Sequence, residues 1–202
     1  MLRSHLKKHG EVVWGLANGM DVSVVQAETI PNKGYGNSTT IAWDVTDAVS
    51  AKNVLLALAE TVGTRLRKAQ VRAEVIAVGI KSSELKYAGH QMTLRHATNV
   101  TNEIHQYACR LFDQLWDGSP IRHLGIHTSR LQDGLDLRQM DLWEEENYDK
   151  LREMDQTVDR IREKHGIDII KRAVFIKSRV DHMSGGISRE KRSVDYDRLQ
   201  IL

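Results

Sequence analysis

Two kinds of hydrophobic periodicity alternate along residues 38–131, and their order is the strongest constraint on the fold. Apolar residues at every second position, typical of strands, mark 38–45, 71–82, 88–96 and 121–131. Apolar residues three and four positions apart, typical of amphipathic helices, mark 50–68 and 101–116. The order β-α-β-β-α-β is that of the split βαβ motif. The sequence therefore predicts an α+β fold, with a four-stranded antiparallel sheet and both helices on one face.

The segments that flank this region differ from it in pattern. Residues 1–19 predict one helix that ends at Asn18-Gly19, and residues 20–36 predict a linker. An extra C-terminal helix is predicted over Tyr148–His165, where apolar residues again follow the helical period. From Arg179 onward the chain is polar and contains glycines, so a flexible tail is predicted there.

Composition is typical of a folded protein from a reducing compartment. The 202 residues are 41% hydrophobic, and no apolar run approaches the roughly 20 residues that span a bilayer. The N-terminus lacks the apolar core of a signal peptide, and Cys109 is the single cysteine, so no internal disulfide can form. We therefore expect a cytoplasmic protein without membrane contact. The first 130 residues are mildly basic and the rest mildly acidic, which points weakly to a polyanionic partner.

Helices on one face would leave the other face of the sheet bare, and period-2 alternation assigns residues to it. The outward positions are Ser38, Thr40, Ala42, Asp44, Ala77, Gly79, Lys81, Gln91, Thr93, Arg95, His123, Gly125, His127 and Ser129. They include one clear acid, Asp44, and no large apolar group that another layer would cover. Short side chains let a phosphate backbone approach closely, and Lys81 and Arg95 add positive charge. The alternatives are a solvated face or one that touches a neighbouring domain.

The stretch KGYGNSTTIAWDV, Lys33–Val45, opens the first strand with two glycines and a run of short polar residues. The positions expected to face the core are Thr39, Ile41, Trp43 and Val45. Residues 36–40 bury little apolar surface, whereas their backbone N–H, amide and hydroxyl groups can donate to phosphate oxygens. Such contacts would position a duplex without reading its sequence.

A compact apolar anchor lies in the acidic stretch that follows the last strand. Its sequence is Gln139-Met140-Asp141-Leu142-Trp143. The three apolar side chains would fill a hydrophobic pocket on a partner, and Gln139 would form a hydrogen bond at the rim of that pocket. The alternatives are that Leu142 and Trp143 pack on the chain's own core or begin the next helix.

No catalytic or metal-binding set is predicted from the sequence. Cys109 lies on an expected helix without a nearby activating pattern, which indicates a packing role. His123 and His127 share a strand face but lie about 13 Å apart at ~3.3 Å per residue, too far to bind one metal ion. The pattern Gly34-Tyr35-Gly36 is too short for a dinucleotide-binding or phosphate-loop motif.

Several long motifs resemble, in order, the C-terminal part of a Y-family translesion DNA polymerase of the DNA polymerase IV branch. The motifs are WGLANGMDVSVV, KGYGNSTTIAWDVTDA, LALAETVGTRLRKAQVRAEVIAVGIKSSEL, HQMTLRHATNVTNEIHQYACRLFDQLWDGSPIRHLGI and RQMDLW, within residues 11–176. The resemblance implies the end of a thumb domain at 1–25, a linker at 26–36 and a DNA-binding little-finger domain at 37–131. It also implies a clamp-binding linker at 132–147, a C-terminal helical segment at 148–178 and a flexible tail at 179–202.

The resemblance, together with the open sheet face, implies two sets of site residues. Duplex primer-template DNA would contact Lys33, Tyr35, Gly36, Asn37, Ser38, Thr39, Thr40, Lys81, Gln91, Thr93, Arg95 and His127. A replication sliding clamp would bind Gln139, Met140, Leu142 and Trp143. We therefore expect a DNA-binding, clamp-tethering module of an error-prone polymerase.

Two departures from the family qualify what the resemblance implies. The family's palm domain, whose carboxylates bind magnesium for two-metal nucleotidyl transfer, is absent from this sequence. We therefore expect no catalytic residue and no cofactor in this chain, which would be a part or a natural truncation of a nucleotidyltransferase. The linker at 26–36 is also less basic than is usual in the family, with Lys33 its single cation.

Two other functions stay open at this point. A stand-alone domain of this kind would bind the clamp or a regulator without DNA. An orphan enzyme on a split βαβ sheet would need a pocket with converging titratable residues, and the sequence shows none.

Overall fold

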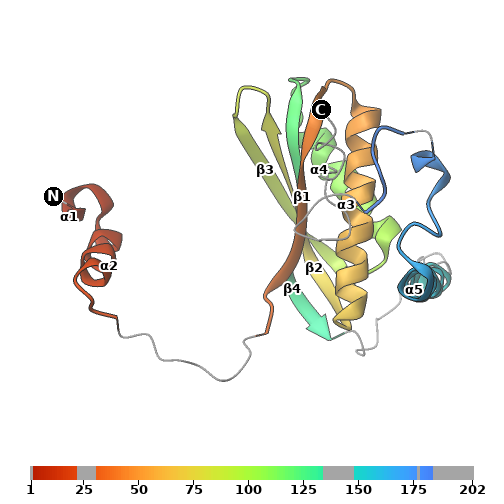
Figure 1. The fold of residues 1–202 in the computed structure, drawn as a ribbon, viewed down its shortest axis with the longest axis horizontal. Helices are drawn as coiled ribbons and strands as arrows, with labels where there is room; N and C mark the ends of the chain where they lie inside the picture. Colours follow the sequence, from red (N-terminus) through yellow and green to blue (C-terminus); the bar gives the residue numbers. More distant parts are fainter. Residues whose placement is uncertain (1, 22–30, 134–147, 177, 184–202) are drawn as a thin grey trace, which may run out of the picture. The chain divides into compact units, whose positions relative to one another are not determined.

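The computed structural model describes residues 2–21, 31–133, 148–176 and 178–183, and the chain divides into two compact units, Met1–Asn32 and Lys33–Leu202 (Figure 1). The first unit contains α1 (Leu2–Leu6) and α2 (Lys8–Ala17). The prediction of one helix over 1–19 is therefore wrong, because Lys7 adopts a left-handed φ of 51° that interrupts it. Helix α2 ends at Asn18-Gly19 as predicted, with Gly19 at a φ of 73°.

The second unit has the predicted order of elements. It contains β1 (Gly34–Val45), α3 (Ala48–Lys68), β2 (Val71–Ser82), β3 (Tyr87–Thr98), α4 (Thr101–Leu115) and β4 (Ile121–Asp133). The strands form one antiparallel sheet in the order β1-β4-β2-β3, so β1 and β3 are its edges. The predicted α+β fold with a four-stranded antiparallel sheet is confirmed. Strand β1 begins at Gly34 rather than Ser38, so the last residues of the predicted linker belong to the sheet.

Helix α3 combines a side-chain cap with an apolar stripe. Asp47 accepts a hydrogen bond from the Ser50 N–H at 2.8 Å, and this bond lowers the pKa of the Asp47 carboxyl. The stripe is almost completely buried and consists of Val54, Leu55, Leu58, Val62 and Leu66. Burying each of these side chains contributes roughly 1.5–3 kcal/mol, so the stripe holds α3 against the sheet.

The core lies between α3, α4 and one face of the sheet (Figure 1). Its buried strand residues include Ile41, Val45, Ile76, Val78, Ile80, Leu124 and Ile126. Phe112 of α4 is fully buried and stacks on Trp116, with ring centroids 5.3 Å apart. The alternation predicted for the strands is confirmed by these positions, and none of the helices described in the second unit lies on the opposite face of the sheet (Figure 1).

A C-terminal segment packs on α3 on the side away from the sheet (Figure 1). It consists of α5 (Tyr148–His165), as predicted, and continues through the short helix η1 (Ala173–Phe175). Buried ion pairs join α5 to α3, because Arg67 lies 3.0 Å from Asp155 and 2.6 Å from Asp159. Helix α5 is therefore attached to α3 by charged groups that pair with each other, while Phe175 and Val180 of the same segment join the hydrophobic core.

Glu60 of α3 is 3% exposed and forms a second point of attachment for this segment. Burial acts to raise the pKa of Glu60, but a hydrogen bond from His182 and the charges of Arg162 and Arg172 outweigh burial and lower it. Because His182 is fully buried beside Glu60, residues 178–183 belong to the packed segment. The flexible tail predicted from residue 179 is therefore wrong at its start, and residues 184–202 lie outside the described residues.

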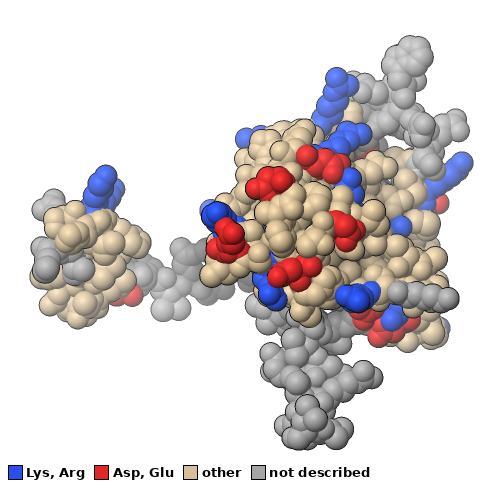
Figure 2. Space-filling view, turned by 90° about the horizontal axis from the view of Figure 1, so that it is seen from above, with Lys and Arg blue, Asp and Glu red and all other residues tan. Residues whose placement is uncertain are grey.

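The surface of the second unit seen from above carries acidic and basic side chains side by side, without a patch of one sign (Figure 2). Within the described part of the chain, no helix combines the length and apolar character needed to cross a bilayer.

Candidate nucleic-acid interface

The sheet face opposite α3 and α4, here called the open face, is organised in rows of residues that run across all four strands. Cross-strand pairing gives the rows Thr40–His123–Lys81–Tyr87, Ser38–Gly125–Gly79–Gly89 and Gly36–His127–Ala77–Gln91. The middle row has glycine on three strands and serine on the fourth. No carboxylate occurs in the three rows, and Lys81 supplies a permanent positive charge.

A groove with a volume of about 850 Å³ crosses the strands along the middle row. Its floor is the backbone of Gly125, Gly79 and Gly89, which carry no side chains of their own. His127 from one flanking row and His123 from the other border it. We call this feature the cross-strand groove.

The glycines of the cross-strand groove are in close contact with the side chains around it. A Cβ atom added to Gly79 would lie 2.7 Å from the Tyr87 hydroxyl, and one added to Gly125 would lie 3.0 Å from the Ser38 Cβ. The Tyr87 ring therefore lies over Gly79 and Gly89, although 72% of the residue is exposed. Glycine inside a strand lets another backbone approach closely, and here three of them lie side by side.

The charged groups near the cross-strand groove leave the open face weakly basic. Burial lowers the pKa of His123, and the neighbouring charge of Lys81 lowers it further. The His123 Nδ1 lies 3.1 Å from the Thr40 hydroxyl of the same row. Asp44, the acid expected on this face, pairs with Arg122 at 2.9 Å, so its charge is compensated.

The edge strand β1 carries a cation that comes from the helix layer. Arg65 of α3 donates from Nη1 to the Gly36 carbonyl at 2.9 Å and lines the cross-strand groove at its β1 end. The Gly36 carbonyl therefore points away from β4, toward the outside of the sheet. Because N–H and C=O directions alternate along an antiparallel strand, Ser38 and Thr40 also direct their backbone groups to this edge.

The structure places most, but not all, of the predicted DNA-binding residues on the open face. Gly36, Ser38, Thr40, Lys81, Gln91 and His127 lie in the three rows, Thr93 and Arg95 are exposed on β3, and Lys33 is exposed before β1. Asn37 and Thr39 are instead 5% and 8% exposed, and Tyr35 packs against the core. Strand alternation turns these three side chains toward the helices, and whether their backbone groups contact DNA stays a prediction.

The anchor residues Gln139, Met140, Leu142 and Trp143 lie outside the described residues, so their role stays a prediction. The span predicted for the DNA-binding domain, residues 37–131, lies within the span from the start of β1 at Gly34 to the end of β4 at Asp133, and its boundaries stay a prediction.

Three residues of the interface were missed by the sequence reasoning. His123 was assigned to the correct face by alternation, and its place beside the groove becomes visible only with the strand register. Tyr87 lies just before the predicted strand at 88–96, whereas in the structure it opens β3 and covers two glycines. Arg65 gives no signal in the sequence, because its helical position predicts exposure to solvent and not contact with a strand edge.

The side chains with nucleophilic potential are engaged in packing. Burial raises the pKa of the Cys109 thiol to about 11, so the thiol stays protonated near neutral pH. Its Sγ lies 3.2 Å from the His105 Nε2, which itself lies 3.0 Å from the Lys52 carbonyl oxygen. Burial also lowers the pKa of His105. The pair therefore lacks the thiolate that nucleophilic catalysis needs.

One cluster in the C-terminal segment has metal-ligand residue types. Possible ligand atoms of Asp168, Asp181 and His182 lie within 4.8 Å of one another. The Lys171 ammonium lies 2.9 Å from Asp168 and 3.5 Å from Asp181, and these contacts raise its pKa, the hydrogen bond that it donates to Asp168 most. A cation of the chain itself therefore compensates the two carboxylates.

Residues 32–142 match the family model described as the impB/mucB/samB family C-terminal domain. The chain belongs to this family, and its sheet and helices form the little-finger-like domain of a Y-family polymerase. Over 177 residues it is 34% identical to DNA polymerase IV of Clostridium acetobutylicum, a match that covers 88% of this chain and 44% of that protein. It is 33% identical over 177 residues to DNA polymerase IV 2 of Halalkalibacterium halodurans, covering 84% and 42%. The chain thus spans less than half the length of these curated relatives.

A solved complex of a beta-clamp processivity factor and the little finger domain of PolIV aligns with 55% of this chain and 99% of that domain. The TM-score of this alignment is 0.43 at 18% sequence identity.

Proposed function

We propose that this chain is a non-catalytic module that holds primer-template DNA for a translesion polymerase and tethers the polymerase to a sliding clamp. The observation that carries the DNA-binding part is the open face, with its cross-strand groove, its exposed cations and its lack of acids in the three central rows. Family membership supports the same assignment. Magnesium and the carboxylates that bind it would belong to the palm domain of such a polymerase.

The contacts available on the open face suit phosphate recognition rather than base recognition. Lys81 and Lys33 provide point charges, and Arg95 provides a planar guanidinium with paired donors. Ser38 and Thr40 provide hydroxyl donors. The side chains of Ser38 and Thr40 are too short to reach far into a DNA groove, so they contact the backbone of whatever sequence is bound. A module that tolerates any sequence suits a polymerase that must hold distorted DNA.

Duplex binding measured at two salt concentrations tests this proposal. If three cations contact phosphates, the slope of log K against log salt is about −2.7, and affinity falls roughly 40-fold between 50 and 200 mM salt. Fluorescence anisotropy with two 20-base-pair duplexes of unrelated sequence measures both the slope and the sequence dependence. Affinity that does not change with salt, or that differs strongly between the duplexes, contradicts the proposal.

A matched pair of variants locates the binding surface. Lys81→Gln removes a cation from the open face and is expected to reduce the magnitude of the salt slope by about 0.9. Lys150→Gln removes a cation from the exposed surface of α5 and is expected to leave the slope unchanged. Equal effects of the two variants would place the bound DNA elsewhere.

Clamp tethering is proposed from the anchor sequence and the family. Capture by an immobilised bacterial sliding clamp is expected for the wild-type chain and is expected to be lost in a Gln139→Ala/Trp143→Ala variant. Asp141→Ala changes the spacer of the same segment and should be captured like wild type. Circular dichroism of the double variant separates a lost anchor from a lost fold, because a change in the spectrum would instead indicate that these residues pack on the core.

A further inference from the structure

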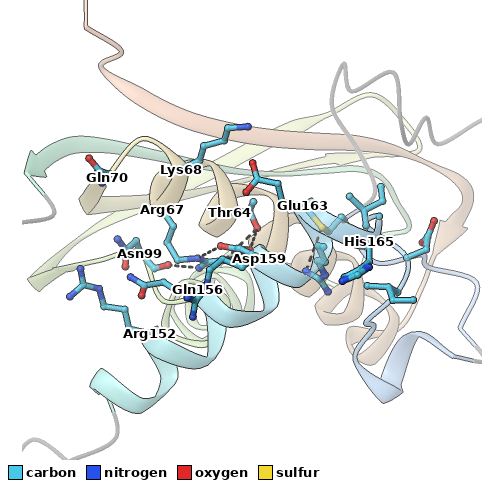
Figure 3. Close-up of a pocket in the computed structure, with 17 residues that line it drawn as sticks. Thr64, Arg67, Lys68, Gln70, Asn99, Arg152, Gln156, Asp159, Glu163 and His165 are labelled. Atoms are coloured by element: carbon cyan, nitrogen blue, oxygen red, sulfur yellow. Dashed lines mark hydrogen bonds and ion pairs between the residues drawn. The ribbon is translucent and has the colours of Figure 1, made fainter.

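Arg65 differs from the other cations in the last turn of α3 in what it faces. Arg67 is held by Asp155 and Asp159 of α5, and Lys68 lines a separate cavity between α3 and the C-terminal segment (Figure 3). Arg65 instead extends to the edge of β1 and lines the cross-strand groove. It is therefore the one of these three side chains that brings positive charge from the helix layer to the open face.

The hydrogen bond to Gly36 orients the Arg65 guanidinium but uses only part of its set of N–H donors. The guanidinium has five N–H donors, and within the described part of the chain one of them is used, by the Gly36 carbonyl at 2.9 Å. No ion pair joins Arg65 to a described carboxylate. A guanidinium that is oriented by one bond and retains a planar set of donors is well suited to bind an anion with two oxygens.

The surroundings of Arg65 provide further donors for the same anion. Ser38 is the next residue of β1 whose backbone groups point to the outer edge, and its hydroxyl lies on the open face in the floor row of the groove. Across the groove the floor continues over Gly125 and Gly79 to Gly89. Three strand spacings of ~4.8 Å make this floor about 14 Å long. The exposed Tyr87 ring lies over its last two glycines, so a phosphodiester backbone that crosses the whole sheet displaces this ring.

We propose that Arg65 anchors a phosphate of the bound DNA strand at the β1 end of the cross-strand groove, and that the phosphodiester backbone crosses the sheet along the groove. This inference rests on the proposed DNA-binding function and adds a positioning residue to it. Arg65 belongs to a helix on the other side of the sheet, so it grips the strand at the edge where the backbone leaves the open face. The groove determines the path of the phosphodiester backbone across the sheet, and Arg65 determines the position of the backbone along that path.

Three variants of the full chain test the anchor. Arg65→Gln removes the charge, Arg65→Lys keeps the charge but loses the planar fork, and Lys68→Gln removes a charge three residues further along the same helix. Each is titrated against a 20-base-pair duplex by fluorescence anisotropy at four salt concentrations between 50 and 300 mM. The salt slope is the informative readout, because a residue with a merely structural role changes stability without changing the number of phosphates contacted.

For Arg65→Gln we expect a slope smaller in magnitude by about 0.9 and roughly tenfold weaker binding at the lowest salt concentration. Arg65→Lys is expected to restore the slope but not the full affinity, since a lysine binds phosphate as a point charge. Lys68→Gln is expected to change affinity less than about twofold and to leave the slope at the wild-type value. Thermal unfolding of each variant confirms that the protein is folded at the titration temperature.

The possible negative results distinguish the proposed role of Arg65 from the DNA-binding function on which it rests. If the wild-type chain binds duplex with a steep salt dependence and Arg65→Gln keeps the wild-type slope, the anchor is wrong and DNA binding stands. If Arg65→Gln and Lys68→Gln weaken binding equally, the effect is a diffuse one of net charge, which also refutes the anchor. If the wild-type chain does not bind duplex at all, the proposed function itself fails.

Discussion

Helix α4 begins without a capping side chain of its own, and Asp155 of α5 supplies the missing acceptor. The residue before the helix is Val100, whose side chain cannot accept a hydrogen bond. Asp155 Oδ2 accepts the Thr101 N–H at 2.7 Å and also lies 3.0 Å from the Arg67 Nη1. One carboxylate therefore caps α4 and pairs with a buried cation of α3. We predict that Asp155→Ala destabilises the fold more than any other single change on α5.

The expected magnitude follows from the two contacts. Loss of an N-terminal cap costs about 1 kcal/mol. Removing one partner of a buried ion pair costs roughly 3–5 kcal/mol when the remaining charge is left alone. Arg67 keeps Asp159 at 2.6 Å, so we expect about 2 kcal/mol from this contact and about 3 kcal/mol in total. Asp155→Asn keeps an oxygen acceptor for Thr101 and loses the charge, so it should cost about 2 kcal/mol.

Urea unfolding followed by circular dichroism measures these values, with thermal unfolding as a second probe. A loss of about 3 kcal/mol corresponds to a Tm lower by roughly 6–12 °C for a unit of this size. Glu153→Ala, on the exposed side of α5, is the matched control and should lie within about 0.5 kcal/mol of wild type. If Asp155→Ala is as stable as this control, the docking of α5 does not depend on the buried carboxylate and the reasoning is refuted.

Three other predictions concern buried and open-face groups. Glu60 has a lowered pKa in the folded state, so its charge contributes stability above its unfolded pKa of 4.5, and this contribution is lost as pH falls through the folded value. Glu60→Gln should therefore be less stable than wild type at pH 7 and approach it below about pH 4; an equal difference at both pH values contradicts this. The pKa of His123 is lowered below 6.5, so this side chain becomes a cation only as the pH falls through that lowered value; duplex binding should strengthen there, a gain that His123→Gln should reduce. Gly79→Val fills the groove floor and should weaken duplex binding at least tenfold. It displaces the exposed Tyr87 ring but valine favours strands, so the Tm should change little. Ser129→Val on the same face is its control, and equal binding by both variants would show that the groove is not the path of the DNA.

The elements of the sheet unit could be predicted because their signals are local. The stripe of α3 repeats with the helical period over five buried residues, and β2 was placed at Val71–Ser82 by alternation alone. The open face followed from the same alternation. At Asn37 the resemblance and the alternation disagree: Thr39 was assigned to the core, and the period of two places the buried Asn37 on the same face of the sheet.

The contacts that the sequence did not reveal join residues far apart in the chain. Asp155 caps a helix that begins 54 residues earlier, and His182 packs beside Glu60. In the sequence, Asp155 and Glu60 look like solvated surface groups. A charged residue is seldom buried without a partner, and the partners of these two acids lie far away in the chain. The cross-strand groove also depends on register, because Gly79, Gly89 and Gly125 become a row only when three strands are aligned.

The last turn of α3 links the stability of the unit to its proposed grip on DNA. Successive residues of an α-helix are about 100° apart, so Arg65 and Arg67 point in nearly opposite directions. Docking of α5 on Arg67 therefore fixes the rotation of this turn, and with it the position from which Arg65 reaches the Gly36 carbonyl. If this coupling is strong, Asp155→Ala should weaken duplex binding at temperatures where it is still folded, without changing the salt slope, because the number of phosphate contacts is the same and only their alignment is lost. A smaller slope in Asp155→Ala would mean that Arg65 has left the interface altogether.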